Sequence, residues 1–221
     1  AKEKLPIASL TKLMTALVVL DTYDLSKKVT ISSVAMAQEG EQGVLKLGET
    51  LTVKDLLYIT LMESSNRSAY ALSEVVGPEA FINIMNAYAL NMGLKNTRFQ
   101  DASGLDQRSY STAEDLVILS SYLFENYPLF REISGLKEYS VYMSDGSLHH
   151  VLVNTNKMLG QEAVISGKTG FTEKALGCFM TITYSPVKGH YMVSVVLGSG
   201  DRFGDMQKLI DWVSSAYTFT F

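Results

Sequence analysis

The spacing of apolar residues along the 221-residue chain changes near residue 137, and this change limits the fold more than any other feature. Between about residues 10 and 135, apolar residues recur three and four positions apart, which is the period of helices that bury one face. From Glu138 to Leu197 they alternate with polar residues or form short apolar runs, which is typical of strands. The sequence therefore predicts an α+β fold, with a helical region before an antiparallel sheet that helices flank.

Residues that cap or break helices divide the first part. We expect helices directly after Ser9, from Thr52 to about Glu63, from Ser68 to Val76, from Pro78 to Gly93, after Thr112, and briefly after Pro128. The segment Asp101–Tyr110, rich in Gly, Ser and Asp, is predicted to be a loop.

The second part is predicted to contain five strands and a closing helix. The strands are Glu138–Met143 and His149–Val153 around an Asp145-Gly146 turn, then Val164–Thr169, Leu176–Tyr184 and Tyr191–Leu197. The helix is Asp205–Ser215. We expect residues 1–221 to form one catalytic domain, with an inserted helical region at about 30–135 and a sheet region at about 138–200.

Composition excludes several classes of function. Apolar residues make up 47% of the chain, which is enough for a sizeable core, and the net charge is −4 without a basic face, which argues against nucleic acid as a partner. No apolar stretch is long enough to span a bilayer, so membrane contact is expected only through segments outside this chain. The single cysteine, Cys178, allows no internal disulfide and is expected to be buried in a strand.

No cofactor is expected, and a zinc enzyme is disfavoured. The three histidines, His149, His150 and His190, do not stand in a zinc-ligand motif. We expect each of them at the surface of a strand or turn.

Ser9-Leu10-Thr11-Lys12 is the first candidate for chemistry. Residues three apart share a helix face, so the Ser9 hydroxyl and the Lys12 amine can meet. A lysine among apolar residues loses hydration, which lowers its pKa and suits it to take the serine proton. The pattern alone is weak, because Ser-x-x-Lys is expected roughly once by chance in a chain of this length. It recurs at Ser134–Lys137 and Ser185–Lys188, which we interpret as surface coincidences.

Ser64-Ser65-Asn66, between two predicted helices, is the second candidate. A second hydroxyl can relay a proton to a leaving amine, and the Asn66 amide can hold a peptide carbonyl while contacting the lysine. An ordinary helix cap is the alternative interpretation.

Lys168-Thr169-Gly170, at the end of a predicted strand, is the third candidate and the most specific. A strand edge can pair with an extended peptide, Lys168 and Thr169 offer a charge and a hydroxyl to a carboxylate, and Gly170 lets a substrate backbone come close. A hairpin turn is the alternative.

In this order, the three motifs are the signature set of penicillin-binding proteins and serine β-lactamases. The segments Pro6–Ala16 and Ser166–Thr172 resemble the low-molecular-mass serine D-alanyl-D-alanine carboxypeptidases. So do Lys95–Phe99, Ser103–Asp106 and Tyr110–Ala113, and the resemblance covers nearly the whole chain. It implies a β-lactamase/transpeptidase-like fold and an exported, extracytoplasmic enzyme that trims peptidoglycan stem peptides ending in D-Ala-D-Ala and is inhibited by β-lactams.

The resemblance also implies roles for individual residues. Ser9 would be the nucleophile, Lys12 its base and Ser64 the proton relay, through an acyl-enzyme. The substrate would be bound by Asn66, Lys168, Thr169, Gly170, Phe171 and Arg202, with the backbone N–H groups of Ser9 and Phe171 as oxyanion hole. For Arg202 an ordinary surface arginine is the alternative interpretation, since that is the usual case.

The sequence departs from the family at its start, because the one or two strands that precede the catalytic serine in relatives have no counterpart here. Two alternative functions stay open. A class A-like β-lactamase would need a Glu for deacylation, and the only similar pattern, Glu79 to Asn83, looks like a solvated helix face. A non-enzymatic penicillin-sensing domain would share Ser-x-x-Lys.

Overall fold

The computed structural model describes residues 1–216 apart from residues 41, 162, 186 and 188. The α+β prediction is confirmed. The elements are, in chain order, β1 (Leu5–Pro6), the 3₁₀ helix η1 (Ala8–Leu10), α1 (Thr11–Thr22), β2 (Lys28–Thr30), α2 (Ser33–Met36), β3 (Thr50–Thr52), α3 (Val53–Met62), α4 (Asn66–Glu74), α5 (Pro78–Asn91), β4 (Tyr110–Ser111), α6 (Ala113–Asn126), α7 (Pro128–Gly135), β5 (Glu138–Tyr142), β6 (Leu148–Val153), β7 (Val164–Thr172), β8 (Leu176–Tyr184), β9 (Tyr191–Ser199) and α8 (Arg202–Ala216).

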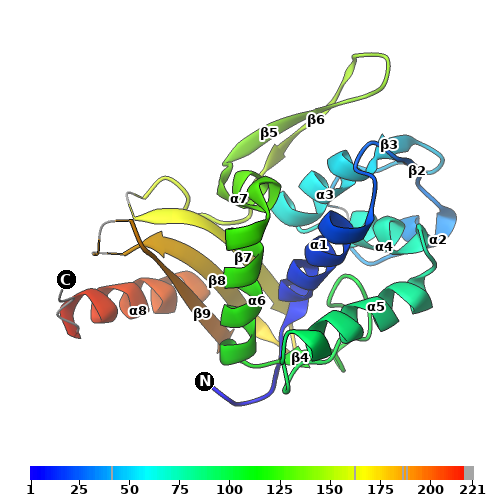
Figure 1. Ribbon diagram of the computed structural model, residues 1–221. Coiled ribbons are helices and arrows are strands. Elements are labelled where there is room, and N and C mark those ends of the chain that lie inside the picture. The colour runs from blue at the N-terminus through cyan, green and yellow to red at the C-terminus, as the bar shows by residue number, and fades with distance from the viewer. Residues whose placement is uncertain (41, 162, 186, 188, 217–221) are drawn as a thin grey trace.

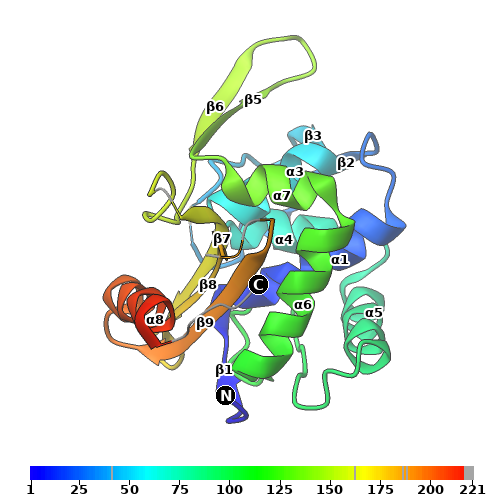
Figure 2. The same ribbon diagram turned by 60° about the vertical axis from the view of Figure 1, so that its left-hand side comes forward.

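The central sheet is antiparallel, in the order β7-β8-β9. Helix α8 covers one face of it, and α6 lies on the other side (Figure 2). Because β8 is covered on both faces, all of its residues except the two end ones are buried. This explains why Leu176–Tyr184 is a nearly continuous apolar run rather than an alternating one.

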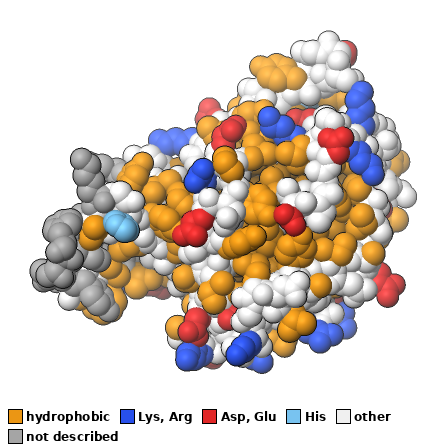
Figure 3. Space-filling view, in the orientation of Figure 1, with side chains coloured by type: hydrophobic (Ala, Val, Ile, Leu, Met, Phe, Trp, Pro, Cys, Tyr) orange, Lys and Arg blue, Asp and Glu red, His pale blue; other side chains and the backbone are white. Residues whose placement is uncertain are grey.

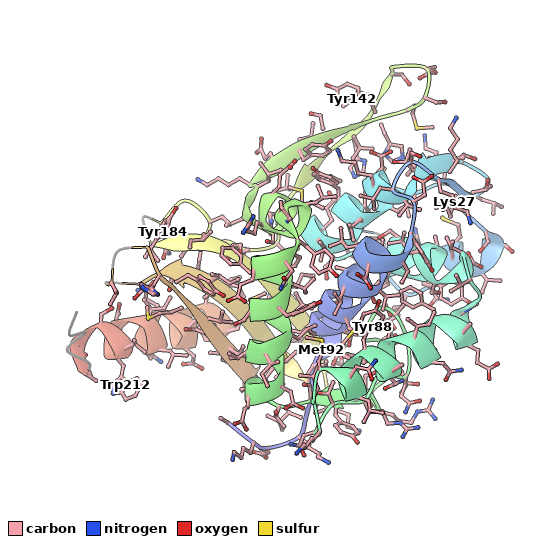
Figure 4. All side chains as sticks on the ribbon, in the orientation of Figure 1. Lys27, Tyr88, Met92, Tyr142, Tyr184 and Trp212 are labelled. Atoms are coloured by element: carbon pink, nitrogen blue, oxygen red, sulfur yellow. The ribbon has the colours of Figure 1, made fainter. Side chains whose placement is uncertain are left out.

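Helix α1 is the core of the helical region. Every residue from Thr11 to Val19 is buried, and the helix packs against α3, α4, α5 and α6. On the α5 side, Tyr88 points toward α1 and its hydroxyl donates to Asp21 (Figure 4). Figure 1 shows α1 at the centre of the molecule, between the other helices. Lys12 lies in its first turn, and Ser9 lies in η1 directly before it.

Most predicted helix ends are confirmed by their caps. Thr52 forms a capping box with Asp55 at the start of α3, and the Thr112 hydroxyl accepts from the backbone N–H of Asp115 at the start of α6. Helix α4 begins at Asn66 instead of Ser68, because Ser65 is its cap and accepts from the Ser68 N–H at 3.3 Å. Asn66 is therefore held in a helix rather than in a loop.

Strands β5 and β6 do not join the central sheet. They pair with each other as a separate hairpin that projects beyond the body (Figure 1). Val141 and Leu152 are buried at its base, whereas Tyr142 lies far out and is exposed (Figure 4). The alternating pattern predicted the strands correctly, but it carries no information about which sheet they join.

The three histidines of the chain were predicted at the surface, and for the two in this hairpin that prediction is wrong. The side chains of His149 and His150 are only 5% and 12% exposed. Their Nε2 atoms lie 3.1 Å from the carboxylates of Glu49 and Glu63, respectively, because the hairpin folds back onto the end of α3. His190 is exposed, as expected.

The short strand β1 pairs with β4 and not with the central sheet, and within the described part of the chain β9 pairs with β8 alone. None of the helices formed by the described residues is long and apolar enough to cross a membrane. Figure 3 shows acidic and basic side chains scattered over one face, between broad apolar areas. Cys178 lies in β8 and is fully buried, as predicted, and burial raises the pKa of its thiol.

Candidate active site

Ser9 and Lys12 meet at the start of α1. Ser9 lies in η1, one turn before the regular helix, and its Oγ is 2.9 Å from Lys12 Nζ. The amine is fully buried and has two further partners, Asn66 Oδ1 at 2.6 Å and the carbonyl oxygen of Ser103 at 2.8 Å. Three segments that are distant in sequence therefore converge on one nitrogen.

The hydrogen-bonding capacity of these three partners determines whether the Lys12 amine can accept a proton from Ser9. A carbonyl oxygen and an amide oxygen only accept hydrogen bonds, so Asn66 and Ser103 take two N–H groups from Lys12. The Ser9 hydroxyl is the one partner that can also donate. A neutral Lys12 amine therefore directs its lone pair at the Ser9 hydroxyl, which is the arrangement required to remove its proton.

The environment favours the neutral amine. Burial lowers the pKa of Lys12 to about 7, and the charge of Asp101 acts in the opposite direction. Desolvation has this effect because it penalises the charged form of the lysine. A base with a pKa near neutrality is partly free to accept a proton at physiological pH.

The second motif faces the first one across the site. Asn66 presents its oxygen to Lys12 because its Nδ2 donates to the carbonyl of Glu39 at 2.8 Å, which fixes the amide orientation. Ser64, just before the helix, has a φ of 63°, a conformation that is uncommon for residues other than glycine. This turn aims its side chain at the third motif instead of into the helix α4.

The third motif supplies a second buried amine. Lys168 Nζ donates to Ser64 Oγ at 2.8 Å and to the carbonyl of Thr169 at 2.9 Å. Burial lowers the pKa of Lys168 well below its usual range, and the charges of Lys12 and Arg202 add to this effect. Ser64 therefore receives a hydrogen bond from an amine and keeps its own proton available to another acceptor.

Gly170 allows a close approach of β7 to η1. A Cβ atom at this position would lie 3.0 Å from the backbone nitrogen of Ser9 and 3.1 Å from the carbonyl of Ile7. We expected this glycine to let a substrate backbone come close, and in the structure it also lets the strand lie against the serine turn. The backbone nitrogen of Ser9 thereby lies close to Gly170, the residue before Phe171.

Arg202 is not the surface residue that is usual for arginine. It is half-buried at the start of α8, and its Nη1 donates to the carbonyl of Gly170 at 2.8 Å. Phe171, next to that carbonyl, is 62% exposed. Thr169 is nearly buried, and its hydroxyl donates to Thr155 Oγ1 at 2.7 Å.

All of these groups surround one cleft of about 730 Å³. It is lined by seven of the predicted site residues, Ser9, Ser64, Asn66, Thr169, Gly170, Phe171 and Arg202. Lys12 and Lys168 lie beneath it and reach it through the hydroxyls of Ser9 and Ser64. The structure thus brings together every residue that the sequence placed in the site.

Three contributions were missed by the sequence analysis. The carbonyl of Ser103 binds Lys12, the Thr155 hydroxyl binds Thr169, and the backbone of Glu39 orients Asn66. Two of these act through backbone atoms, which every residue has, so no side-chain pattern could have found them. Thr155 lies in the connection between two strands, where nothing in its neighbourhood indicates a role.

The other Ser-x-x-Lys segments lie elsewhere. Ser134 is buried in α7, not at the surface as predicted, and its hydroxyl donates to the carbonyl of Phe130. Lys188, in the segment from Ser185, lies outside the described residues. Glu79 and Asn83 are exposed on α5, as expected. Across the described residues, no three acidic, histidine or cysteine side chains are placed to hold a metal ion.

Residues 1–201 match the family model described as D-alanyl-D-alanine carboxypeptidase. The chain is 34% identical to a D-alanyl-D-alanine endopeptidase of Escherichia coli K12, over 95% of this chain and 70% of that protein. It is 32% identical to D-alanyl-D-alanine carboxypeptidase DacF of Bacillus subtilis 168, over 98% of this chain and 58% of the relative. Among solved structures, the Streptomyces K15 DD-transpeptidase superposes with a TM-score of 0.88 at 31% identity, covering 96% of this chain and 88% of that one.

Proposed function

This chain belongs to the D-alanyl-D-alanine carboxypeptidase family of serine peptidases, and from that premise we propose which of its residues carry the reaction. The cleft removes the terminal D-alanine from a peptidoglycan stem peptide, through an acyl-enzyme on Ser9. One observation carries the proposal: the buried Lys12 amine has two partners that only accept hydrogen bonds, and its Nζ lies 2.9 Å from the Ser9 hydroxyl.

The first step is attack on the carbonyl between the two D-alanines. Lys12 takes the proton from Ser9 Oγ, which bonds to the carbonyl carbon and leaves a negative charge on the carbonyl oxygen. The N–H groups of Ser9 and Phe171 are proposed to stabilise that charge, supported by the close approach of the Ser9 backbone nitrogen to Gly170. Removing one such donor typically costs about 3–4 kcal/mol of transition-state stabilisation.

The second step is departure of D-alanine. Its nitrogen needs a proton, which the Ser64 hydroxyl can give while it accepts a hydrogen bond from Lys168. Ser64 is proposed to regain a proton from the protonated Lys12, so that the proton taken from Ser9 ends on the leaving amine and Lys12 is neutral again. Water then takes the place of the leaving amine, with Lys12 again as base, and releases the shortened peptide from Ser9.

The rim formed by β7 and α8 is proposed to hold the terminal carboxylate. The Thr169 hydroxyl can serve as a donor if its proton turns from Thr155 to the substrate, and Arg202 offers the guanidinium N–H groups that are not used on Gly170. Asn66 would accept or donate to the peptide group on the other side of the cleft. Such a carboxylate site favours cleavage at a free chain end. We propose that the enzyme acts where stem peptides are found, on the outer side of the cytoplasmic membrane.

The test is acylation by penicillin, measured by intact mass, together with D-alanine release from a pentapeptide ending in D-Ala-D-Ala. We expect one stable adduct and D-alanine release with wild-type protein, and neither with Ser9→Ala. Ser134→Ala, in the other described Ser-x-x-Lys segment, is the matched control and should retain both. An adduct that persists in Ser9→Ala would refute the assignment of the nucleophile.

The same assay separates the alternative functions. A β-lactamase would turn penicillin over rapidly and leave no lasting adduct. A sensor would form the adduct without releasing D-alanine. An endopeptidase would cleave a cross-linked dimer in preference to the linear pentapeptide.

A further inference from the structure

Asp101 is a charged group near the active site that the proposed reaction does not use. It lies in the loop between α5 and β4, is half-buried, and belongs to none of the three motifs. Its carboxylate accepts from the hydroxyls of Ser103 at 2.6 Å and Ser109 at 3.3 Å. It also accepts from three consecutive backbone N–H groups, which are those of Gly104, Leu105 and Asp106.

These bonds determine the position of the loop. One carboxylate that holds five donors closes residues 101–109 into a compact turn, because buried donors are rarely left without a partner. The turn presents the Ser103 carbonyl to Lys12 Nζ at 2.8 Å and the Ala102 carbonyl to Thr15 Oγ1 at 2.6 Å. Asp101 thereby fixes one of the two oxygens that hold the Lys12 amine.

The loop is also locked against the serine turn. A Cβ atom on Gly104 would lie 1.9 Å from the carbonyl oxygen of Ala8, the residue before Ser9. A carboxylate that positions this loop therefore acts on the orientation of both partners in the Ser9–Lys12 pair.

Accordingly, we propose that Asp101 is the positioning residue that sets the geometry and the charge state of Lys12, resting on the proposed function of Lys12 as base. It acts in two separable ways. Its hydrogen bonds hold the Ser103 carbonyl in place, and its negative charge stabilises the protonated form of the amine.

The second effect, that of the Asp101 charge on Lys12, agrees with the environment of this lysine. Burial lowers the pKa of Lys12, and the charge of Asp101 is the influence that raises it. Removing that charge while keeping an acceptor oxygen should lower the pKa of Lys12 further, so that the neutral base persists to a lower pH.

The variant Asp101→Asn makes this change, since an amide keeps one acceptor oxygen but has no charge. The rate of acylation by a chromogenic penicillin is measured against pH, and the part of this profile where the rate rises as Lys12 loses its proton is its rising limb. We expect the rising limb of Asp101→Asn to lie about one pH unit below that of the wild type. One unit is the lower end of the pKa shift that a nearby opposite charge causes. For each protein the acylation rate is divided by its own plateau rate at high pH. At a pH far below the midpoint, this ratio should be about tenfold higher for Asp101→Asn than for the wild type.

Two further variants separate charge from structure. Asp101→Glu keeps the charge, so its limb should stay at the wild-type pH even if its plateau rate falls. Asp106→Asn is the matched control: it removes the same charge from the same loop, where the side chain pairs with Arg108 near the surface at 2.6 Å. It should leave the limb and the plateau unchanged.

The inference is overturned if Asp101→Asn keeps the wild-type limb, or if Asp101→Asn and Asp101→Glu show the same limb whatever their plateau rates. A folding defect does not hide the answer, because the position of the limb is measured on the fraction of protein that acylates. If wild-type protein forms no adduct at all, the proposed function fails instead, so the two failures are distinguishable.

Discussion

Substituting Gly104 by alanine should damage catalysis through packing alone. Gly104 has a φ of +87°, which costs a residue with a Cβ atom about 1–2 kcal/mol. The new Cβ atom would also lie 1.9 Å from the Ala8 oxygen and 2.8 Å from Thr11 Oγ1. The loop and the serine turn must therefore separate by about 1 Å, and overpacking of this kind costs about 1–3 kcal/mol more.

The separation acts directly on the reacting groups. The Ala8 carbonyl adjoins Ser9, and the residue before Gly104 provides an oxygen that holds Lys12. A displacement of 1 Å in a catalytic group can cost about 10²-fold in rate. We therefore expect Gly104→Ala to be less stable by about 2–5 kcal/mol and to be acylated about 10²-fold more slowly.

Gly146→Ala separates strain from clash. Gly146, in the hairpin turn, has a nearly identical φ of +83°, but nothing lies within 4 Å of its Cβ position. It should lose about 1–2 kcal/mol and keep the full acylation rate. Urea unfolding gives the stabilities, and a chromogenic penicillin gives the rates. Equal acylation rates for the two variants would refute the argument that this contact holds the site together.

Three further results are expected. The acylation rate of the wild type should rise about tenfold from pH 6 to pH 8, because Lys12 with a pKa of about 7 is protonated below that pH and free above it; a flat profile would exclude Lys12 as the base. Cys178 should resist iodoacetamide at pH 8 in the folded protein and react after denaturation, because burial raises its pKa and blocks access; rapid alkylation of folded protein would contradict this. Thr52→Ala should lower the free energy of unfolding by about 1 kcal/mol through loss of the α3 cap, with acylation retained; unchanged urea unfolding would show that the cap contributes nothing.

Local signals predicted most of the helices and strands. Thr52, Pro78 and Thr112 start helices because caps and prolines act on the backbone beside them, and the run of β8 was found to the residue. The prediction was weaker where a boundary depends on competition between neighbours. Ser65 caps α4 in place of a later residue because its hydroxyl reaches the Ser68 N–H, and either serine could serve as a cap in isolation.

The histidines show a different limit. His149 and His150 lie on a strand pair whose alternation is regular, and a polar residue on such a pair is expected to face water. The hairpin instead folds back so that Glu49 and Glu63 meet the two rings. These partners lie about 100 and 87 positions earlier in the chain, and no rule of local spacing connects residues that far apart.

By itself, the sequence determined that a helical region precedes the strands. It also indicated which side chains could attack, accept a proton or bind a carboxylate. Both follow from residue types and from spacings within one turn of a helix or strand. Only the tertiary structure decided that Lys12 is fully buried, that its amine faces Asn66 and Ser103, and that Asp101 holds the loop behind it. The reason is physical: a lysine's pKa and direction are set by desolvation and by partners brought from 54 and 91 residues away, which exist only once the chain has folded around it.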